Sequence, residues 1–98
     1  MSKPVDELPV PADVQIEGGS EVLRAFISDG GLSVSLIRGF DEPDTWGLLL
    51  VDVIRHVSRA FNAEDGVSEA EVEARIVRMM MAELENPTDL GTTSTQNN

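Results

Sequence analysis

The stretch at residues 44–61, DTWGLLLVDVIRHVSRAF, constrains the fold more than any other part of the chain. It is the longest segment with periodic apolar residues, and it holds the single tryptophan. At about 100° per residue, six apolar side chains fall within roughly a third of the helical circle. They are Trp46, Leu50, Val53, Ile54, Val57 and Phe61. The segment is therefore predicted to be an amphipathic α-helix.

A second helix is predicted from residue 69 to residue 86. Ser68 and Glu71 have the spacing of a capping box, and Pro87 marks the end of the helix. Its apolar stripe consists of Val72, Ile76, Met79, Met80 and Leu84. The pattern indicates that the two helices pack together through Trp46, Val53 and Val57 on one and Val72, Ile76 and Met80 on the other.

Residues 22–28 and 32–38 are rich in strand-forming side chains, and an Asp-Gly-Gly sequence separates them. If Asp29 and Gly30 form a two-residue turn, six apolar residues share one face of a β-hairpin. The pairs are then Ile27 with Leu32, Ala25 with Val34 and Leu23 with Leu36. A three-residue loop would place Arg24 among those side chains, so the two-residue register is preferred.

The two ends of the chain are predicted to lie outside the domain. Residues 1–20 contain three prolines and two glycines and form a disordered or extended tail. The alternation in ADVQIE leaves open whether residues 14–17 add an edge strand. Residues 87–98 are polar and are predicted to be a disordered tail, which leaves one domain at residues 21–86.

The predicted fold class is α+β, with a β-hairpin, or three strands, packed on one face by two α-helices in the order β-β-α-α. A folded part of this size buries only about 60% of its unfolded surface. The chain has no cysteine, which excludes disulfides and cysteine-based metal sites. Stability must therefore come from packing or from oligomerisation.

The net charge of the chain limits the kinds of partner that it can bind. The net charge of −11 repels phosphate backbones and anionic lipid, which disfavours nucleic-acid and membrane binding. No apolar run resembles a signal peptide or a membrane span, so a cytoplasmic location is predicted. One histidine and scattered acids match no metal-ligand pattern, so neither a metal nor a cofactor is predicted.

A polar site is conceivable on the first helix, at Asp52, Arg55, His56 and Arg59. Asp52 lies one turn before His56 and could orient its imidazole as a general base. Arg55 and Arg59 could hold a phosphate or a carboxylate. No nucleophile accompanies them, so catalytic residues stay unassigned and an enzyme is not favoured. A surface ion pair for the histidine, and ion pairs with the acidic second helix for the arginines, are the preferred interpretations.

Several apolar residues are better explained by an interface. Val22, Phe26 and Ile37 lie on the second face of the hairpin, while Leu48 and Met81 project from the polar faces of the helices. We therefore expect a small acidic, non-enzymatic module that binds a protein partner or forms a homodimer through the hairpin face. The alternative is a small-ligand (anion) sensor or an enzyme that uses the polar site of the first helix.

Residues 22–61 also carry a series of short motifs in a characteristic order: GGLSVSL, an aromatic residue at Phe40, Trp46-Gly47 after a proline, and DVIRHVSRA. In this respect the chain resembles the core of a small proteobacterial family, the domain of unknown function numbered 5076. The resemblance implies a shared fold and a bacterial cytosolic protein. Because the family has no assigned function, it implies no site residue.

Overall fold

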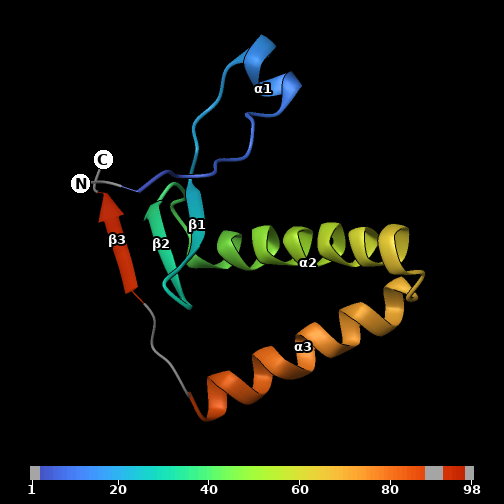
Figure 1. The fold of residues 1–98 in the computed structure, drawn as a ribbon. Helices are drawn as coiled ribbons and strands as arrows, with labels where there is room; N and C mark the ends of the chain where they lie inside the picture. The colour runs from blue at the N-terminus through green and yellow to red at the C-terminus, as the bar shows by residue number, and fades with distance from the viewer. Residues whose placement is uncertain (1–2, 88–91, 97–98) are drawn as a thin grey trace.

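The computed structural model describes residues 3–87 and 92–96 (Figure 1). The elements are α1 (Ala12–Glu17), β1 (Leu23–Ser28), β2 (Gly31–Ile37), α2 (Pro43–Asp65), α3 (Glu69–Glu85) and β3 (Thr92–Gln96). The α+β class and the order β-β-α-α are confirmed, with α1 before them and β3 after them. Figure 1 shows α2 extending away from the sheet and α3 returning along a diverging path.

The β1–β2 hairpin has the predicted register. Ile27 pairs with Leu32 and Ser28 with Gly31, so Asp29 and Gly30 alone make the turn. Both turn residues have positive φ, 52° for Asp29 and 76° for Gly30, as a type I′ turn requires. An Asp-Gly pair meets this requirement with little strain, which is why the turn could be read from the sequence.

The third strand of the sheet is β3, from a segment predicted to be a disordered tail. β3 pairs in parallel with β2, with Ile37 opposite Gln96, so that the strand order is β1-β2-β3. The outer edge of β2 offers a row of backbone donors and acceptors that any extended segment can pair with. The backbone hydrogen bonds to this edge stabilise β3, although the polar composition of the segment suggested disorder. In the described part of the chain, β1 keeps one free edge.

The edge strand that the sequence left open at residues 14–17 is not formed, because these residues belong to α1. The amide of Gln15 donates to the carbonyl oxygen of Pro11 at 3.1 Å, and that of Gly18 donates to Val14 at 2.8 Å. Pro11 precedes the first helical turn, and Gly18 ends it with φ +82°. These local hydrogen bonds decide the conformation because no strand lies close enough to pair with the segment.

The two long helices begin and end at strong local signals. Pro43 is the first residue of α2, which runs to Asp65, four residues beyond its predicted end. Gly66 then adopts a left-handed conformation and ends the helix. The hydroxyl of Ser68 accepts a hydrogen bond of 3.1 Å from the amide of Glu71, which confirms the predicted cap of α3.

Trp46 joins the hairpin to α2. Its indole nitrogen donates a 2.8 Å hydrogen bond to the carbonyl oxygen of Arg38, and its ring meets the Phe40 ring edge-on with centroids 5.5 Å apart. The sequence predicted Trp46 in the contact between the helices. That assignment is wrong, because both partners of Trp46 lie in the linker that follows β2. The hydrogen bond and the ring contact therefore orient the indole toward the hairpin.

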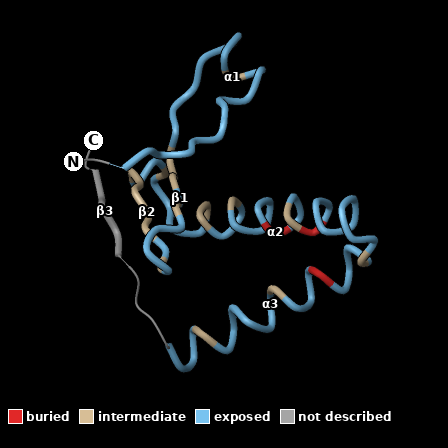
Figure 2. The backbone as a smooth tube through the Cα atoms, in the orientation of Figure 1, coloured by how far each residue is buried: buried red, intermediate tan, exposed pale blue. Residues whose placement is uncertain are grey.

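The buried core of the described chain is small and lies near the turn between α2 and α3 (Figure 2). The buried residues are Ile54, Ser58 and Val72. Ser58 is only 1% exposed and donates to the carbonyl oxygen of Ile54 at 2.8 Å. The predicted stripes therefore meet close to the turn, whereas farther along Val53 and Met80 are 44% and 38% exposed as the helices diverge.

The chain is more open than a folded monomer of its mass. Its accessible surface is 8618 Å², whereas a compact 10.6 kDa protein exposes about 5,500 Å². Its radius of gyration is 15.6 Å, against about 13 Å for a compact chain of this length. Among the described residues, no strand has a Cα atom within 8 Å of a Cα atom of α2 or α3. The helices therefore leave much of the sheet uncovered.

Candidate functional site

An open groove of about 380 Å³ follows the first half of α2. We call it the α2 groove. Its lining is Phe40, Thr45, Leu48, Leu49, Asp52, Val53 and His56. Phe40 contributes from the linker, and the remaining side chains recur along α2 at helical spacing. The groove therefore combines two predicted polar-site residues, Asp52 and His56, with one predicted interface residue, Leu48.

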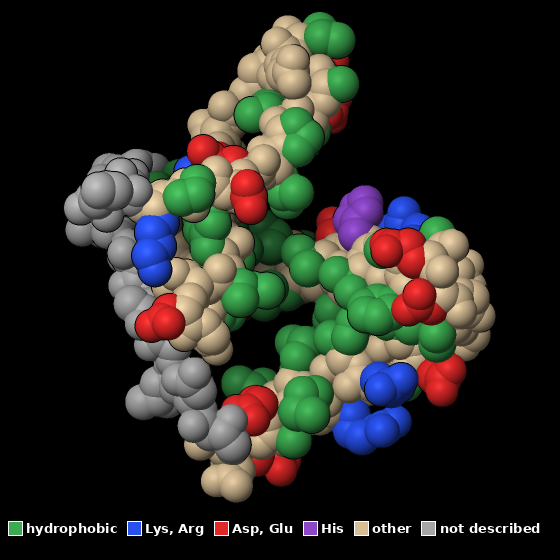
Figure 3. Space-filling model, viewed as in Figure 1, with side chains coloured by type: hydrophobic (Ala, Val, Ile, Leu, Met, Phe, Trp, Pro, Cys, Tyr) green, Lys and Arg blue, Asp and Glu red, His purple; other side chains and the backbone are tan. Residues whose placement is uncertain are grey.

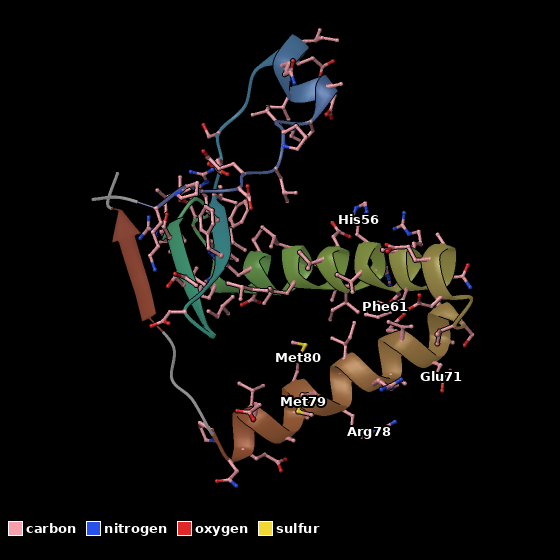
Figure 4. The ribbon with its side chains drawn as sticks, viewed as in Figure 1. His56, Phe61, Glu71, Arg78, Met79 and Met80 are labelled. Carbon is pink, nitrogen blue, oxygen red and sulfur yellow. The ribbon has the colours of Figure 1, made fainter. Side chains whose placement is uncertain are left out.

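The polar residues of the α2 groove are not arranged as a catalytic pair. Asp52 and His56 are both exposed, and among residues 3–87 the structure gives them no hydrogen bond or ion pair with each other. His56 points away from α3 on the opposite side of α2 (Figure 4). Without a fixed carboxylate partner, the imidazole has no imposed tautomer or direction. The groove can contact a ligand here, but the geometry assigns no proton-transfer role.

Arg55 and Arg59 lie one turn apart on α2 and outside the lining of the groove. The sequence predicted that they pair with acids of the second helix. In the part of the chain with described side chains, neither arginine forms an ion pair, so this prediction is wrong. The physical reason is their position on α2: Ile54 and Ser58 beside them are buried in the contact with α3, whereas Arg55 and Arg59 lie on the exposed side of the helix. Both guanidinium groups are exposed and free to meet a carboxylate from elsewhere.

A cluster around Arg24 was not predicted from the sequence. The Arg24 guanidinium forms ion pairs with Glu7 and, at 3.2 Å, with Glu21, and it lies 5.2 Å from the centre of the Phe26 ring. The hydrogen bond that Arg24 donates to the Glu7 carboxylate, together with the charge of Glu21, raises the pKa of Arg24 above its ordinary value. The i, i+3 spacing of Glu21 and Arg24 is readable from the sequence, but nothing indicates that Glu7 returns to β1.

This cluster fastens both ends of a projecting loop, residues 8–20, which we call the N-terminal arm. Glu7 precedes the arm and Glu21 follows it, and both bind Arg24. Figure 1 shows the arm, with α1 at its tip, extending away from the sheet. A cavity of about 650 Å³ lies between the arm and β1. Its lining includes Leu8, Val10, Val14, Leu23 and Phe26.

The predicted interface residues differ in exposure. Val22, Phe26 and Ile37 are half-buried, and Arg24 lies over the ring of Phe26. Leu48 is 69% exposed and Met81 53% exposed. The helix residues are thus the more available of the five, while the hairpin face is partly covered by its own charged neighbours.

The described residues offer few other features from which chemistry could be built. Among them, no group of three or more His, Asp or Glu side chains is placed to hold a metal ion. Within the same residues, no helix combines the length and the apolar character needed to cross a bilayer. Hydrophobic side chains instead dominate the surface facing the space between the sheet and the two helices (Figure 3).

Comparison with known proteins gives the chain a family. A solved structure described as that of "a putative pyruvate dehydrogenase" from the photosynthetic bacterium Rhodopseudomonas palustrus is 47% identical in sequence and superimposes with a TM-score of 0.75. The match covers 98% of this chain and 99% of that one. No curated protein matches the chain. The profile of the family described as "Domain of unknown function (DUF5076)" matches residues 7–88, and the chain therefore belongs to this family.

Proposed function

We propose that the chain is a small, non-enzymatic interaction module that functions as a homodimer. The observation that carries the proposal is the exposed surface of the single chain, about 3,000 Å² more than a compact monomer of its mass would leave. Obligate homodimers bury about 1,000–2,500 Å² per subunit. The excess is therefore large enough to supply a complete dimer interface.

The chemistry of the exposed surface agrees with such an interface. Among the described residues, Ile54 and Val72 are the only buried apolar side chains, whereas 16 large hydrophobic residues are exposed. Ile27 and Leu32, on the hairpin face predicted to be the core, are 89% and 54% exposed. Complete burial of a side chain of this kind contributes about 1.5–3 kcal/mol. Burial of even a few of them in a second copy would stabilise the fold appreciably.

Charge opposes the association of two identical acidic chains. Each copy has a net charge of −11, so two copies repel each other at low ionic strength. Added salt screens this repulsion within a Debye length of about 10 Å at 0.1 M. The repulsion between the two net charges therefore opposes dimerisation most strongly at low ionic strength.

Sedimentation equilibrium between about 1 and 100 μM tests the proposal, because an obligate dimer with a dissociation constant below about 1 μM stays dimeric over most of this range. We expect twice the 10.6 kDa chain mass. The melting temperature should rise with protein concentration, since association stabilises only the folded state. A chain that remains folded and monomeric at 100 μM would disprove the homodimer.

The α2 groove supports a second candidate, a small-ligand sensor. It places the polar groups of Asp52 and His56 beside the apolar side chains of Phe40 and Leu49, the mixture typical of ligand sites. Because a 47% identical protein is described as a putative pyruvate dehydrogenase, pyruvate is the first probe to test. Titration of the labelled protein with pyruvate should shift the His56 ring resonances. Unchanged resonances at about 10 mM pyruvate would remove this ligand from consideration.

A further inference from the structure

We infer that the homodimer is formed by exchange of the N-terminal arms, with the arm of each copy seated against the α2 groove of the other. The inference rests on the proposed homodimer and adds its geometry. The arm supplies exposed apolar side chains and negative charge. α2 supplies a largely apolar groove that has Asp52 in its lining and the two positive charges of Arg55 and Arg59 next to it. The occupant of the α2 groove is thus a defined segment of a second copy of the chain.

The arm has no apolar partner of its own at its outer surface. Leu8 is 93% exposed and Ile16, on α1, is 84% exposed. By contrast, Val14 packs back toward Gly19 within the arm, where a Cβ atom on Gly19 would lie 3.3 Å from a Val14 methyl group. The arm is therefore internally folded, with Ile16 exposed on α1 and Leu8 exposed in the lining of the cavity between the arm and β1. A segment that leaves some of its apolar side chains exposed in its own chain is suited to packing against another molecule.

The attachment of the arm holds it in position for binding. Glu7 and Glu21, which flank the arm, both bind Arg24 on β1, so the two ends of the loop are held at one point. Fixing the arm in this way reduces the conformational entropy that it would lose on binding a partner. In the view of Figure 4, the arm and His56 lie on the same side of α2.

Charge and spacing on the two elements are complementary. Asp13 and Glu17 lie four residues apart on α1, and the arm contains no lysine or arginine. Arg55 and Arg59 lie four residues apart on α2, next to the groove. Because an α-helix rises about 1.5 Å per residue, each pair is separated by about 6 Å along its helix. Two carboxylates of one copy can therefore meet the two unpaired guanidinium groups of the other.

In a dimer with a two-fold axis, the contact between the arm and the α2 groove occurs twice. In an isologous dimer, each arm meets the partner's α2 while its own α2 receives the partner's arm. The cavity of about 650 Å³ between arm and β1 leaves space beneath the arm for apolar side chains of the partner's α2. Leu48, 69% exposed at the groove, is an apolar side chain of α2 that is available to fill such a space. The arm of one copy and α2 of the other would then each cover apolar side chains of the other element.

Disulfide trapping tests the geometry, because the chain contains no cysteine and each introduced thiol is unique. Ile16→Cys and Leu48→Cys chains, one of them labelled with ¹⁵N, are mixed and mildly oxidised. We expect a mixed disulfide at least about tenfold more abundant than that from Ile16→Cys with Val77→Cys, a control on exposed α3. Equal yields from the two mixtures, with a dimeric wild-type protein, would overturn arm exchange and leave the homodimer standing.

Charge reversal provides a second, independent measurement. Arg55→Glu/Arg59→Glu should weaken dimerisation at least about tenfold, and pairing it with an Asp13→Arg/Glu17→Arg chain should restore most of the loss. The control Arg75→Glu/Arg78→Glu makes the same change of net charge on exposed α3 and should change the dissociation constant less than about threefold. Equal weakening by both arginine pairs, or no restoration, contradicts arm exchange. A monomeric wild-type protein would instead refute the dimer itself.

Discussion

The indole N–H of Trp46 donates to the carbonyl oxygen of Arg38 at 2.8 Å, and this bond links the end of the hairpin to the first turn of α2. The Phe40 ring, edge-on to Trp46, occupies the linker between them. Together they fix the direction in which α2 leaves the sheet. The orientation of the long helices therefore depends on one side-chain hydrogen bond and one ring contact.

Trp46→Phe tests this dependence, because it keeps an aromatic ring but removes the N–H donor together with part of the ring area. Loss of a hydrogen bond of this kind should lower the free energy of unfolding by about 1 kcal/mol. Far-UV circular dichroism during urea titration measures the change without needing tryptophan fluorescence. Phe40→Leu, which leaves the donor intact, serves as the comparison. A stability equal to that of the wild type would show that the bond contributes nothing.

Two glycines should respond in opposite directions to alanine. Gly39 has φ +68°, and a Cβ atom there would lie 3.1 Å from a methyl group of Val22. Gly39→Ala should therefore destabilise the fold by more than about 1 kcal/mol. Thermal melts at fixed protein concentration measure this effect, and a melting temperature no lower than that of the wild type would contradict it.

Gly47 lies inside the first turns of α2, and a Cβ atom there would meet nothing within 4 Å. Gly47→Ala should therefore stabilise the chain by about 0.5–1 kcal/mol, because alanine restricts the unfolded backbone and favours helix. The same melts serve as the measurement. A clear destabilisation would indicate that a second molecule packs against this position.

Ser58 is the most deeply buried of the three buried residues in the described chain. It is 1% exposed, and its hydroxyl is satisfied by the carbonyl oxygen of Ile54 in its own helix. Ser58→Ala should stay within about 0.5 kcal/mol of the wild type, since such a bond to the preceding turn adds little to a helix. Ser58→Leu should cost about 1–3 kcal/mol by overpacking the contact. Urea denaturation of both variants compares them, and equal stabilities would mean that the site is not closely packed.

The attachment of the N-terminal arm should depend on salt rather than on the titration of Arg24. Glu7 and Glu21 raise the pKa of Arg24, so its charge is present below its ordinary pKa and is lost only as the pH rises through the higher folded value. Between pH 6 and 9 Arg24 stays charged. About 0.5 M salt should accelerate hydrogen exchange of amides in residues 8–20, as Arg24→Gln should. Exchange in Arg24→Gln identical to the wild type would show that the ion pairs do not hold the arm.

The parts of the fold that were predictable are those encoded in neighbouring residues. The Asp29-Gly30 turn determines the hairpin register, and Ser68 with Glu71 determines the start of α3, since each signal acts over a few residues. The pairing of β3 with β2 and the return of Glu7 to Arg24 involve residues far apart in sequence. No local pattern encodes such contacts, so they appeared only in the structure.

In the candidate site, too, local features could be predicted from the sequence and the arrangement of distant elements could not. The sequence assigned Asp52 and His56 to a polar site and Leu48 to an interface, and in the structure all three line one groove along α2. The periodicity could not show that the helices diverge, because crossing geometry depends on what the helices pack against. The divergence accounts for the exposure of Met80. The predicted ion pairs of Arg55 and Arg59 with α3 were wrong for a different reason, since both arginines lie on the exposed side of α2.

The parallel pairing of β3 with β2 has a consequence for the newly made chain. The hairpin closes through a two-residue turn and can form within microseconds, whereas β3 lies beyond both long helices in the sequence. During synthesis the outer edge of β2 therefore has no partner until residues 92–96 leave the ribosome. An unpaired edge of this kind is a template for aggregation between nascent chains. Truncation before residue 92 should accordingly lower the yield of dispersed protein more than the loss of a polar tail would.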